Sequence, residues 1–88
     1  MTAAVVIYTT GFCGYCSRAR TLFEQKGVAY EEIRVDSDPE RRKEMMHLSG
    51  RRSVPQIFVG DHHIGGCDDL YALDRAGKLD PLINEGSN

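Results

Sequence analysis

The feature that most limits the fold is a series of strand and helix patterns with a Cys-x-x-Cys pair at its first junction. Residues 4–9, AVVIYT, form a continuous apolar run rich in β-branched side chains, which is typical of a buried strand. The segment GFCGYCSR follows at 11–18, and a helical pattern then runs over 15–26. We therefore expect Cys13 and Cys16 where the first strand passes into the first helix.

The remainder of the chain predicts three more strands. Residues 28–35, VAYEEIRV, indicate a second strand with its apolar side chains at alternating positions. Residues 56–60, QIFVG, and 62–66, HHIGG, are expected to be two short strands that meet at the turn residues Gly60 and Asp61. This pattern predicts a β-hairpin.

Two further helices are expected, followed by about one more turn. The first spans 38–50, with Asp38 as its N-cap, Pro39 at its first position and Gly50 as its stop signal. The second helix begins at Cys67 and carries acidic residues in its first turn, where the helix dipole favours negative charge. In the helix expected over 38–50, we expect Met45, Met46 and Leu48 to face the core.

The order of these elements predicts an α/β fold. A helical crossover between the first two strands makes them parallel, and the last two strands form an antiparallel hairpin. The expected architecture is a four-stranded mixed sheet with helices on both faces. A chain of 88 residues is long enough for one domain with a modest core, so residues 1–88 are expected to form a single domain.

Composition narrows the class of function. The chain has 11 basic and 13 acidic residues, so neither nucleic acid nor a membrane surface is indicated as a partner. No apolar run approaches the ~20 residues that span a bilayer, and the N-terminal residues lack a signal peptide pattern. A cytoplasmic location is therefore expected. Three cysteines are too few for a secreted disulfide scaffold, and in a reducing compartment they are more often catalytic or metal-binding.

The position of the Cys-x-x-Cys pair favours redox chemistry. A helix N-terminus stabilises a thiolate, and such sites lower a cysteine pKa to roughly 3.5–7.5. Cys13 is expected to be exposed to attack, with Cys16 one turn inward and within disulfide reach. A structural zinc site would need four ligands. Beyond the Cys-x-x-Cys pair the sequence has no second paired motif, and the candidates are the separate residues Cys67, His47, His62 and His63. Two inert buried cysteines are the other alternative.

Three motifs carry a resemblance to a known family. They are CGYC at 13–16, SVP at 53–55 and GGCDDL at 65–70. In this order and in a chain of this length, they resemble the glutaredoxins, and specifically the small bacterial dithiol glutaredoxins. The resemblance covers nearly the whole chain as a single glutaredoxin domain and implies a thioredoxin-like fold.

The resemblance implies a redox enzyme that uses glutathione as its electron donor. It would reduce protein disulfides and glutathione mixed disulfides, so its partners would be glutathione and glutathionylated or disulfide-containing proteins. Cys13 would be the nucleophile, and Cys16 would close a disulfide with it. The resemblance also implies a monomer without a bound metal.

The resemblance further implies a set of glutathione-binding residues. Pro55 would follow a cis peptide bond, and the backbone of Val54 would pair with the tripeptide. Glycines allow close approach of a ligand, and the N–H groups that open a helix suit a carboxylate. The two aspartates could instead serve only as favourable charge at a helix N-terminus. The implied contacts are Tyr15, Val54, Pro55, Gly66, Cys67, Asp68 and Asp69.

The chain departs from the family at Thr10, where relatives commonly place a lysine for the glycyl carboxylate of glutathione. His47, Arg51 or Arg52 are the candidates to replace that lysine, and the assignment among them stays open. Cys67 has two readings, as a buried small residue or as a regulatory thiol.

Gly14 replaces the usual proline between the two cysteines. Relatives with a small residue here can assemble a [2Fe–2S] cluster between two chains, with Cys13 of each chain and two glutathiones as the four thiolate ligands. The alternative function is therefore a cluster-binding dimer. The presence of Cys16 and the absence of a CGFS motif count against it.

Overall fold

The structure is a computed structural model that describes residues 3–85. The elements follow the predicted order, and the expected final turn is a short fourth helix. Their bounds are β1 Val5–Thr9, α1 Gly14–Gln25, β2 Glu31–Arg34, α2 Pro39–Ser49, β3 Gln56–Val59, β4 His62–Gly65, α3 Cys67–Arg75 and α4 Leu79–Glu85.

The four strands form one mixed sheet in the order β2-β1-β3-β4. Strands β1 and β2 are parallel, whereas β1 with β3 and β3 with β4 are antiparallel. At the centre, Ile7 of β1 lies opposite Ile57 of β3 and Glu32 of β2. The predicted sheet, a parallel pair plus an antiparallel hairpin, is therefore confirmed.

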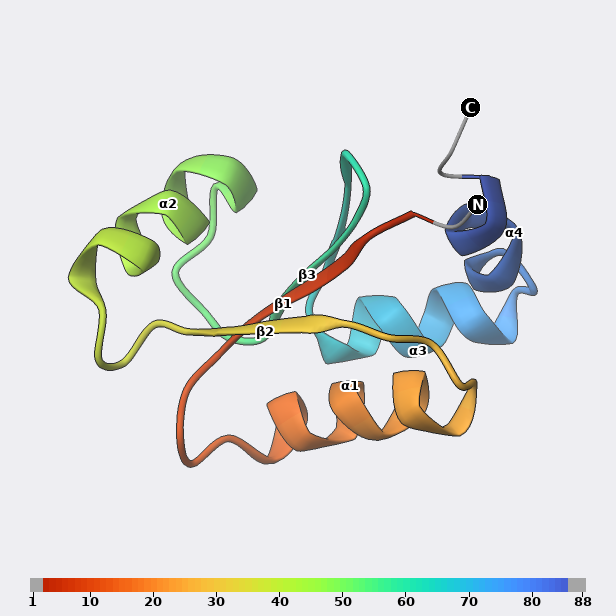
Figure 1. The fold of residues 1–88 in the computed structure, drawn as a ribbon, viewed down its shortest axis with the longest axis horizontal. Coiled ribbons are helices and arrows are strands. Elements are labelled where there is room, and N and C mark those ends of the chain that lie inside the picture. Colours follow the sequence, from red (N-terminus) through yellow and green to blue (C-terminus); the bar gives the residue numbers. More distant parts are fainter. Residues whose placement is uncertain (1–2, 86–88) are drawn as a thin grey trace.

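The helices cover both faces of the sheet, as predicted, but unequally. Helices α1 and α3 lie on one face, and α2 lies on the other (Figure 1). The first face holds the larger cluster of buried side chains, which consists of Ala3, Val5, Ile7, Ala19, Leu22, Phe23, Ile57, Val59, Leu70, Leu79 and Ile83. The α2 face has a smaller buried cluster of Tyr8, Val35 and Met45.

Helix α2 has the predicted ends, but one of its three predicted core residues is wrong. The Asp38 carboxylate accepts the N–H of Arg41 at 3.2 Å as an N-cap, and Gly50 ends the helix with φ 70°. Met45 is buried and Met46 is partly buried, whereas the side chain of Leu48 is 54% exposed. Leu48 lies on the side of Met45 that is opposite to Met46, so it falls outside the narrow face that packs on the sheet.

The second strand is shorter than predicted. Val28 and Tyr30 do pack against the larger core cluster, but they lie before β2 rather than within it. Strand β2 is an edge strand that pairs only with β1, so its ladder extends only where β1 offers partners, at Val6–Thr9. The apolar side chains of residues 28–35 therefore pack against the core, although only part of this segment forms a strand.

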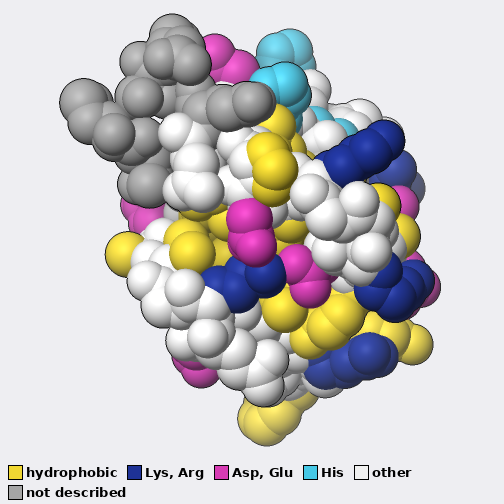
Figure 2. Space-filling view, turned by 90° about the vertical axis from the view of Figure 1, so that its right-hand side faces the viewer, with side chains coloured by type: hydrophobic (Ala, Val, Ile, Leu, Met, Phe, Trp, Pro, Cys, Tyr) yellow, Lys and Arg dark blue, Asp and Glu magenta, His cyan; other side chains and the backbone are white. Residues whose placement is uncertain are grey.

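The end of the molecule away from the β1–α1 loop is held by charged groups. Figure 2 looks onto this end and shows acidic and basic side chains beside one another. The Lys26 ammonium, just after α1, lies 2.7 Å from Asp74 and 2.9 Å from Asp80. It thereby links α1 to α3 and α4. None of the helices in the described part of the chain is long and apolar enough to cross a membrane.

Candidate active site

Cys13 stands at the junction of β1 and α1, where it is the N-cap of the helix. Its backbone is extended, and its sulfur accepts the N–H of Cys16 at 3.1 Å. The first N–H groups of a helix have no partner within the helix, so a side-chain acceptor at the N-cap satisfies one of them. The Cys13 side chain is partly exposed, so this sulfur is open to attack.

Cys16 lies one turn further into α1 and is fully buried. Burial, and then its hydrogen-bonded neighbour Cys13, raise the pKa of the Cys16 thiol to about 12. At neutral pH this thiol is therefore protonated. The third cysteine, Cys67, is also buried, and burial raises the pKa of its thiol as well. All three cysteines are free, and Cys13 is the accessible one.

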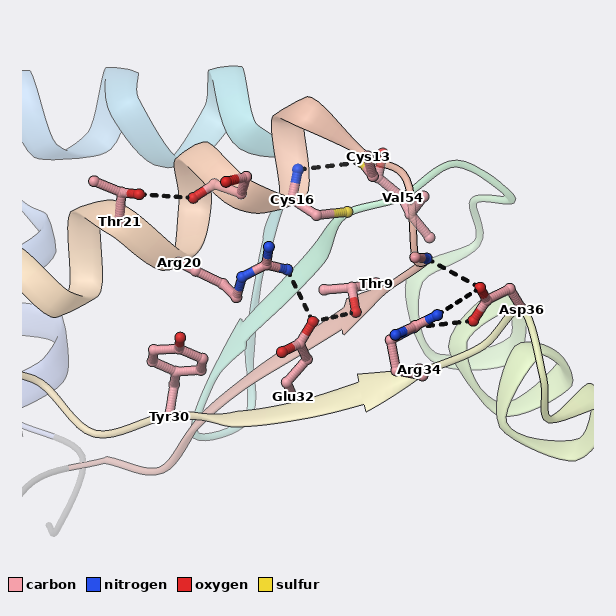
Figure 3. A network of polar contacts seen from close by, with 12 residues as sticks. Thr9, Cys13, Cys16, Arg20, Thr21, Tyr30, Glu32, Arg34, Asp36 and Val54 are labelled. Carbon is pink, nitrogen blue, oxygen red and sulfur yellow. Dashed lines mark hydrogen bonds and ion pairs between the residues drawn. The ribbon is translucent and has the colours of Figure 1, made fainter.

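A carboxylate fixes the loop that leads to Cys13. The N–H of Gly11 donates to Asp36 Oδ2 at 3.0 Å, and Arg34 pairs with the same carboxylate at 2.8 Å (Figure 3). Arg34 and then the Gly11 N–H hold the pKa of Asp36 well below its usual range. Sequence reasoning missed Asp36. The available signal was its place directly after the strand predicted over 28–35, because the carboxyl ends of parallel neighbouring strands meet at one sheet edge.

A second polar network lies between α1 and the strands β1 and β2. The Thr9 hydroxyl, which is fully buried, donates to Glu32 at 2.7 Å, and Arg20 of α1 pairs with the same carboxylate at 2.9 Å (Figure 3). These contacts attach α1 to the two parallel strands. Arg20 is one helical turn beyond Cys16, and the two residues therefore share one face of the helix.

A groove of about 280 Å³ runs beside Cys13. The Cys13 sulfur lies 3.9 Å from the carbonyl oxygen of Val54, which is one of the groove residues. The lining brings together all seven residues that the resemblance implied for glutathione, and it adds Ser53, which sequence reasoning did not single out. The full lining is Tyr15, Ser53, Val54, Pro55, Gly66, Cys67, Asp68 and Asp69. The Val54–Pro55 peptide bond is cis, as the resemblance implied.

The far side of the groove is the start of α3. The Asp69 carboxylate accepts the N–H of Gly66, the N-cap, at 2.9 Å, and pairs with Arg51 at 3.1 Å. Gly66 and then Arg51 lower the pKa of Asp69. Gly65 has φ 114°, and the Asp69 carboxylate occupies the space that a Cβ at Gly65 would need. The N–H groups of Cys67 and Asp68 lie in the first turn, where helical N–H groups lack intrahelical partners.

Of the three candidates to replace the family lysine, only Arg51 adjoins the groove. Arg51 is next to the groove through its ion pair with Asp69. His47 is an exposed residue of α2, and neither His47 nor Arg52 lines the groove. Phe12, beside Cys13, is fully exposed, and Tyr15 is 59% exposed. Sequence reasoning passed over Phe12, although an aromatic residue in a short glycine-flanked loop has little core to pack against.

Gly14 is exposed, and no atom lies within 4 Å of the position that a Cβ would take there. Within residues 3–85 no group of three or more His, Cys, Asp or Glu side chains is arranged to hold a metal ion. A cluster shared between two chains would draw on only Cys13 from each. The [2Fe–2S] alternative therefore stays a prediction.

The fold and the Cys-x-x-Cys pair at the β1–α1 junction together define a protein of the thioredoxin-like class. A solved complex of buckwheat glutaredoxin with glutathione superposes with a TM-score of 0.87, at 36% identity over 97% of this chain and 80% of that one. A glutaredoxin of Pseudomonas aeruginosa is 55% identical over 80 residues, which are 91% of this chain and 95% of the relative. Glutaredoxin 3 of Escherichia coli K12 is 54% identical over 81 residues, 92% of this chain and 98% of the relative.

The glutaredoxin family model matches residues 5–64. The chain belongs to the glutaredoxin family, as the three sequence motifs indicated. Family and fold together support a general role as a thiol–disulfide oxidoreductase.

Proposed function

We propose that this chain is a glutathione-dependent thiol–disulfide oxidoreductase in which Cys13 is the nucleophile and Cys16 the resolving thiol. The observation that carries the proposal is the placement of a partly exposed sulfur at a helix N-cap beside a groove lined by backbone and acidic groups. The likeness to a glutaredoxin solved with glutathione supports the choice of glutathione as the ligand of this groove.

In the first step, the Cys13 thiolate attacks the glutathione sulfur of a glutathionylated substrate. The substrate's sulfur–sulfur bond breaks, the substrate thiolate leaves and takes up a proton, and a Cys13–glutathione disulfide remains. The thiolate of a second glutathione then attacks the bound glutathione sulfur. This releases glutathione disulfide and restores the Cys13 thiolate, so one mixed disulfide has been reduced at the cost of one free glutathione thiol.

Protein disulfides follow a route that uses both cysteines. Cys13 attacks one substrate sulfur and forms a mixed disulfide with the protein. Cys16 then loses its proton and attacks the Cys13 sulfur, which releases the reduced protein and leaves a Cys13–Cys16 disulfide. Two glutathiones reduce this disulfide. Because burial keeps Cys16 protonated at neutral pH, Cys13 reacts first and Cys16 second.

The groove would hold the glutathione part of the substrate. The backbone of Val54 would pair with the tripeptide as a short added strand, and Tyr15 would pack along its side. The first N–H groups of α3 would bind the γ-glutamyl carboxylate, and Asp68 or Asp69 would accept its ammonium group. Of the three candidate cations, Arg51 adjoins the groove, but its ion pair with Asp69 puts it at the proposed γ-glutamyl end. The partner of the glycyl carboxylate among His47, Arg51 and Arg52 therefore stays a prediction.

The test is glutathione-dependent reduction of a glutathionylated peptide by the wild type, Cys13→Ser and Cys16→Ser. We expect Cys13→Ser to be inactive and Cys16→Ser to retain turnover on this substrate while losing activity on a protein disulfide. An inactive wild type, or an active Cys13→Ser, would contradict the proposal. The visible spectrum of the protein prepared without oxygen tests the alternative, because a bound [2Fe–2S] cluster absorbs visible light.

A further inference from the structure

Gln56, the first residue of β3, is a fully buried polar side chain. It directly follows the groove segment of Ser53, Val54 and Pro55, on which the proposed function relies for glutathione pairing. A buried amide is costly unless its donors and acceptor are paired. The partners of Gln56 therefore show what its amide group does.

The amide nitrogen of Gln56 binds back onto the groove segment. Its Nε2 donates to the carbonyl oxygen of Ser53 at 3.0 Å and lies 3.3 Å from the Ser53 hydroxyl. The Ser53 carbonyl belongs to the peptide unit that leads directly into Val54. Gln56, the first residue of β3, thus anchors the backbone immediately before Val54 to the sheet.

The amide oxygen of Gln56 is in turn held by His63 of β4, with 2.7 Å between His63 Nε2 and Gln56 Oε1. Because the amide nitrogen is committed to Ser53, the oxygen faces His63 and can only accept, so His63 Nε2 carries the proton. The imidazole ring stacks on Phe58, with 4.9 Å between ring centroids and 32° between planes, and this packing fixes its orientation.

Two charged residues on the other side of the groove also influence His63. Burial and then Arg51 lower the pKa of His63, while Asp69 acts in the opposite direction. The imidazole is therefore neutral at neutral pH. In this state it donates through Nε2 alone, which keeps the Gln56 amide in the orientation that binds Ser53.

We propose that His63 and Gln56 are positioning residues that fix the Ser53–Val54 backbone in the conformation that pairs with glutathione. The chain of contacts runs from β4 through β3 into the groove, so His63 acts on the ligand only through Gln56. This inference rests on the proposed function, since it assigns a role in binding glutathione at the same site.

The experiment measures binding of S-methylglutathione, which cannot form a disulfide, by nuclear magnetic resonance titration of the full chain. His63→Leu removes the donor at similar size, and His63→Gln returns an Nε2 donor at a similar distance from the backbone. We expect His63→Leu to raise the Kd about fivefold, as the loss of one neutral hydrogen bond implies, and His63→Gln to recover most of the affinity.

Two further variants separate positioning from general disturbance. His62→Leu changes the exposed neighbour on the same strand and should leave the Kd unchanged. Gln56→Met should weaken binding at least as much as His63→Leu, and the double variant should bind no worse than Gln56→Met alone, because His63 acts through Gln56. The rate at which iodoacetamide alkylates Cys13 should stay the same in every folded variant.

The outcomes are distinguishable. A wild type that does not bind S-methylglutathione would overturn the proposed function together with this inference. A wild type that binds, alongside a folded His63→Leu of equal affinity, would overturn the inference alone. The inference would also be overturned if His63→Gln bound S-methylglutathione as weakly as His63→Leu does, or if His62→Leu bound it as weakly as either.

Discussion

Cys13, Cys16 and Cys67 carry the same thiol group in three different surroundings. Cys13 is partly exposed at a helix N-cap, whereas the other two are buried, and burial raises the pKa of both. We expect iodoacetamide at pH 7 to add one group to the folded protein, at Cys13, and three in denaturant. Peptide mass spectrometry locates the modified residue. Modification of Cys67 ahead of Cys13 would contradict the assignment.

Asp69 contributes to stability as well as to the groove. It accepts the N–H of the α3 N-cap and pairs with Arg51, so Asp69→Ala should lower the free energy of unfolding by about 1 kcal/mol at pH 7. Its pKa is lowered in the folded state, so this contribution is present above the unfolded value of about 3.9 and is lost as pH falls through the lower folded value.

Urea unfolding at pH 7 and at about pH 2.5 checks this expectation. The difference between the wild type and Asp69→Ala should be clear at pH 7 and should shrink in acid. Asp68→Ala is the matched control, because Asp68 is exposed in the same helical turn and lines the same groove. Equal losses for the two variants at pH 7 would show that the cap and the ion pair of Asp69 add nothing beyond helix N-terminal charge.

At the scale of elements, α2 attaches to the sheet by a narrow contact. Met45 is fully buried there, whereas Leu48 on the same helix is 54% exposed. Met45→Ala should therefore cost about 2–5 kcal/mol of unfolding free energy, and Leu48→Ala less than about 0.5 kcal/mol. Urea midpoints of the two variants test this pair. A large loss for Leu48→Ala would mean that α2 packs through a wider face.

The elements also show why sequence reasoning worked in some places and not in others. The ends of α2 were predictable because Asp38, Pro39 and Gly50 act locally, through their own backbone and side-chain chemistry. The inward side of α2 was predicted correctly for Met45 and Met46 but not for Leu48, because charged and apolar residues alternate around this helix without a clear apolar stripe. Which residues face the sheet is then set by where the helix docks.

The candidate site divides in the same way. The three motifs point to the seven groove residues, because each motif is a short local pattern. Asp36 was missed because its contact with Gly11 joins residues 25 apart in the chain, and the pairing of Gln56 with His63 depends on the register of the β3–β4 hairpin. The one local sign of the Gln56–His63 contact in the sequence is a glutamine at the start of an apolar strand.

For the molecule as a whole, the two faces of the sheet differ in how much they bury. Helices α1, α3 and α4 share the larger core cluster, and the α2 face has only three buried members. The Tyr8 hydroxyl adds one hydrogen bond across that smaller face, to Glu44 of α2 at 2.6 Å. Burial and this bond raise the pKa of Tyr8 to about 12.

We therefore expect α2 to open locally before the rest of the molecule. Amide hydrogen exchange should show lower opening free energies for α2 than for β1, β3 and α1, because fewer apolar contacts hold it. Tyr8→Phe should lower protection further in α2 while leaving α1 unchanged. Uniform protection across all helices would contradict this, and would mean that the whole chain opens as a single unit.

The turn at Gly65 also restricts how this protein can change by mutation. Gly65 has a backbone conformation that other residues rarely adopt, and the Asp69 carboxylate fills the space where a larger side chain would begin. Replacing Asp69 first would clear that space but would give up the cap on α3. Single-step mutational paths through positions 65 and 69 are therefore costly in either order. Variation that retunes the groove's ligand preference has its open routes at exposed positions such as Tyr15, Ser53 and Asp68.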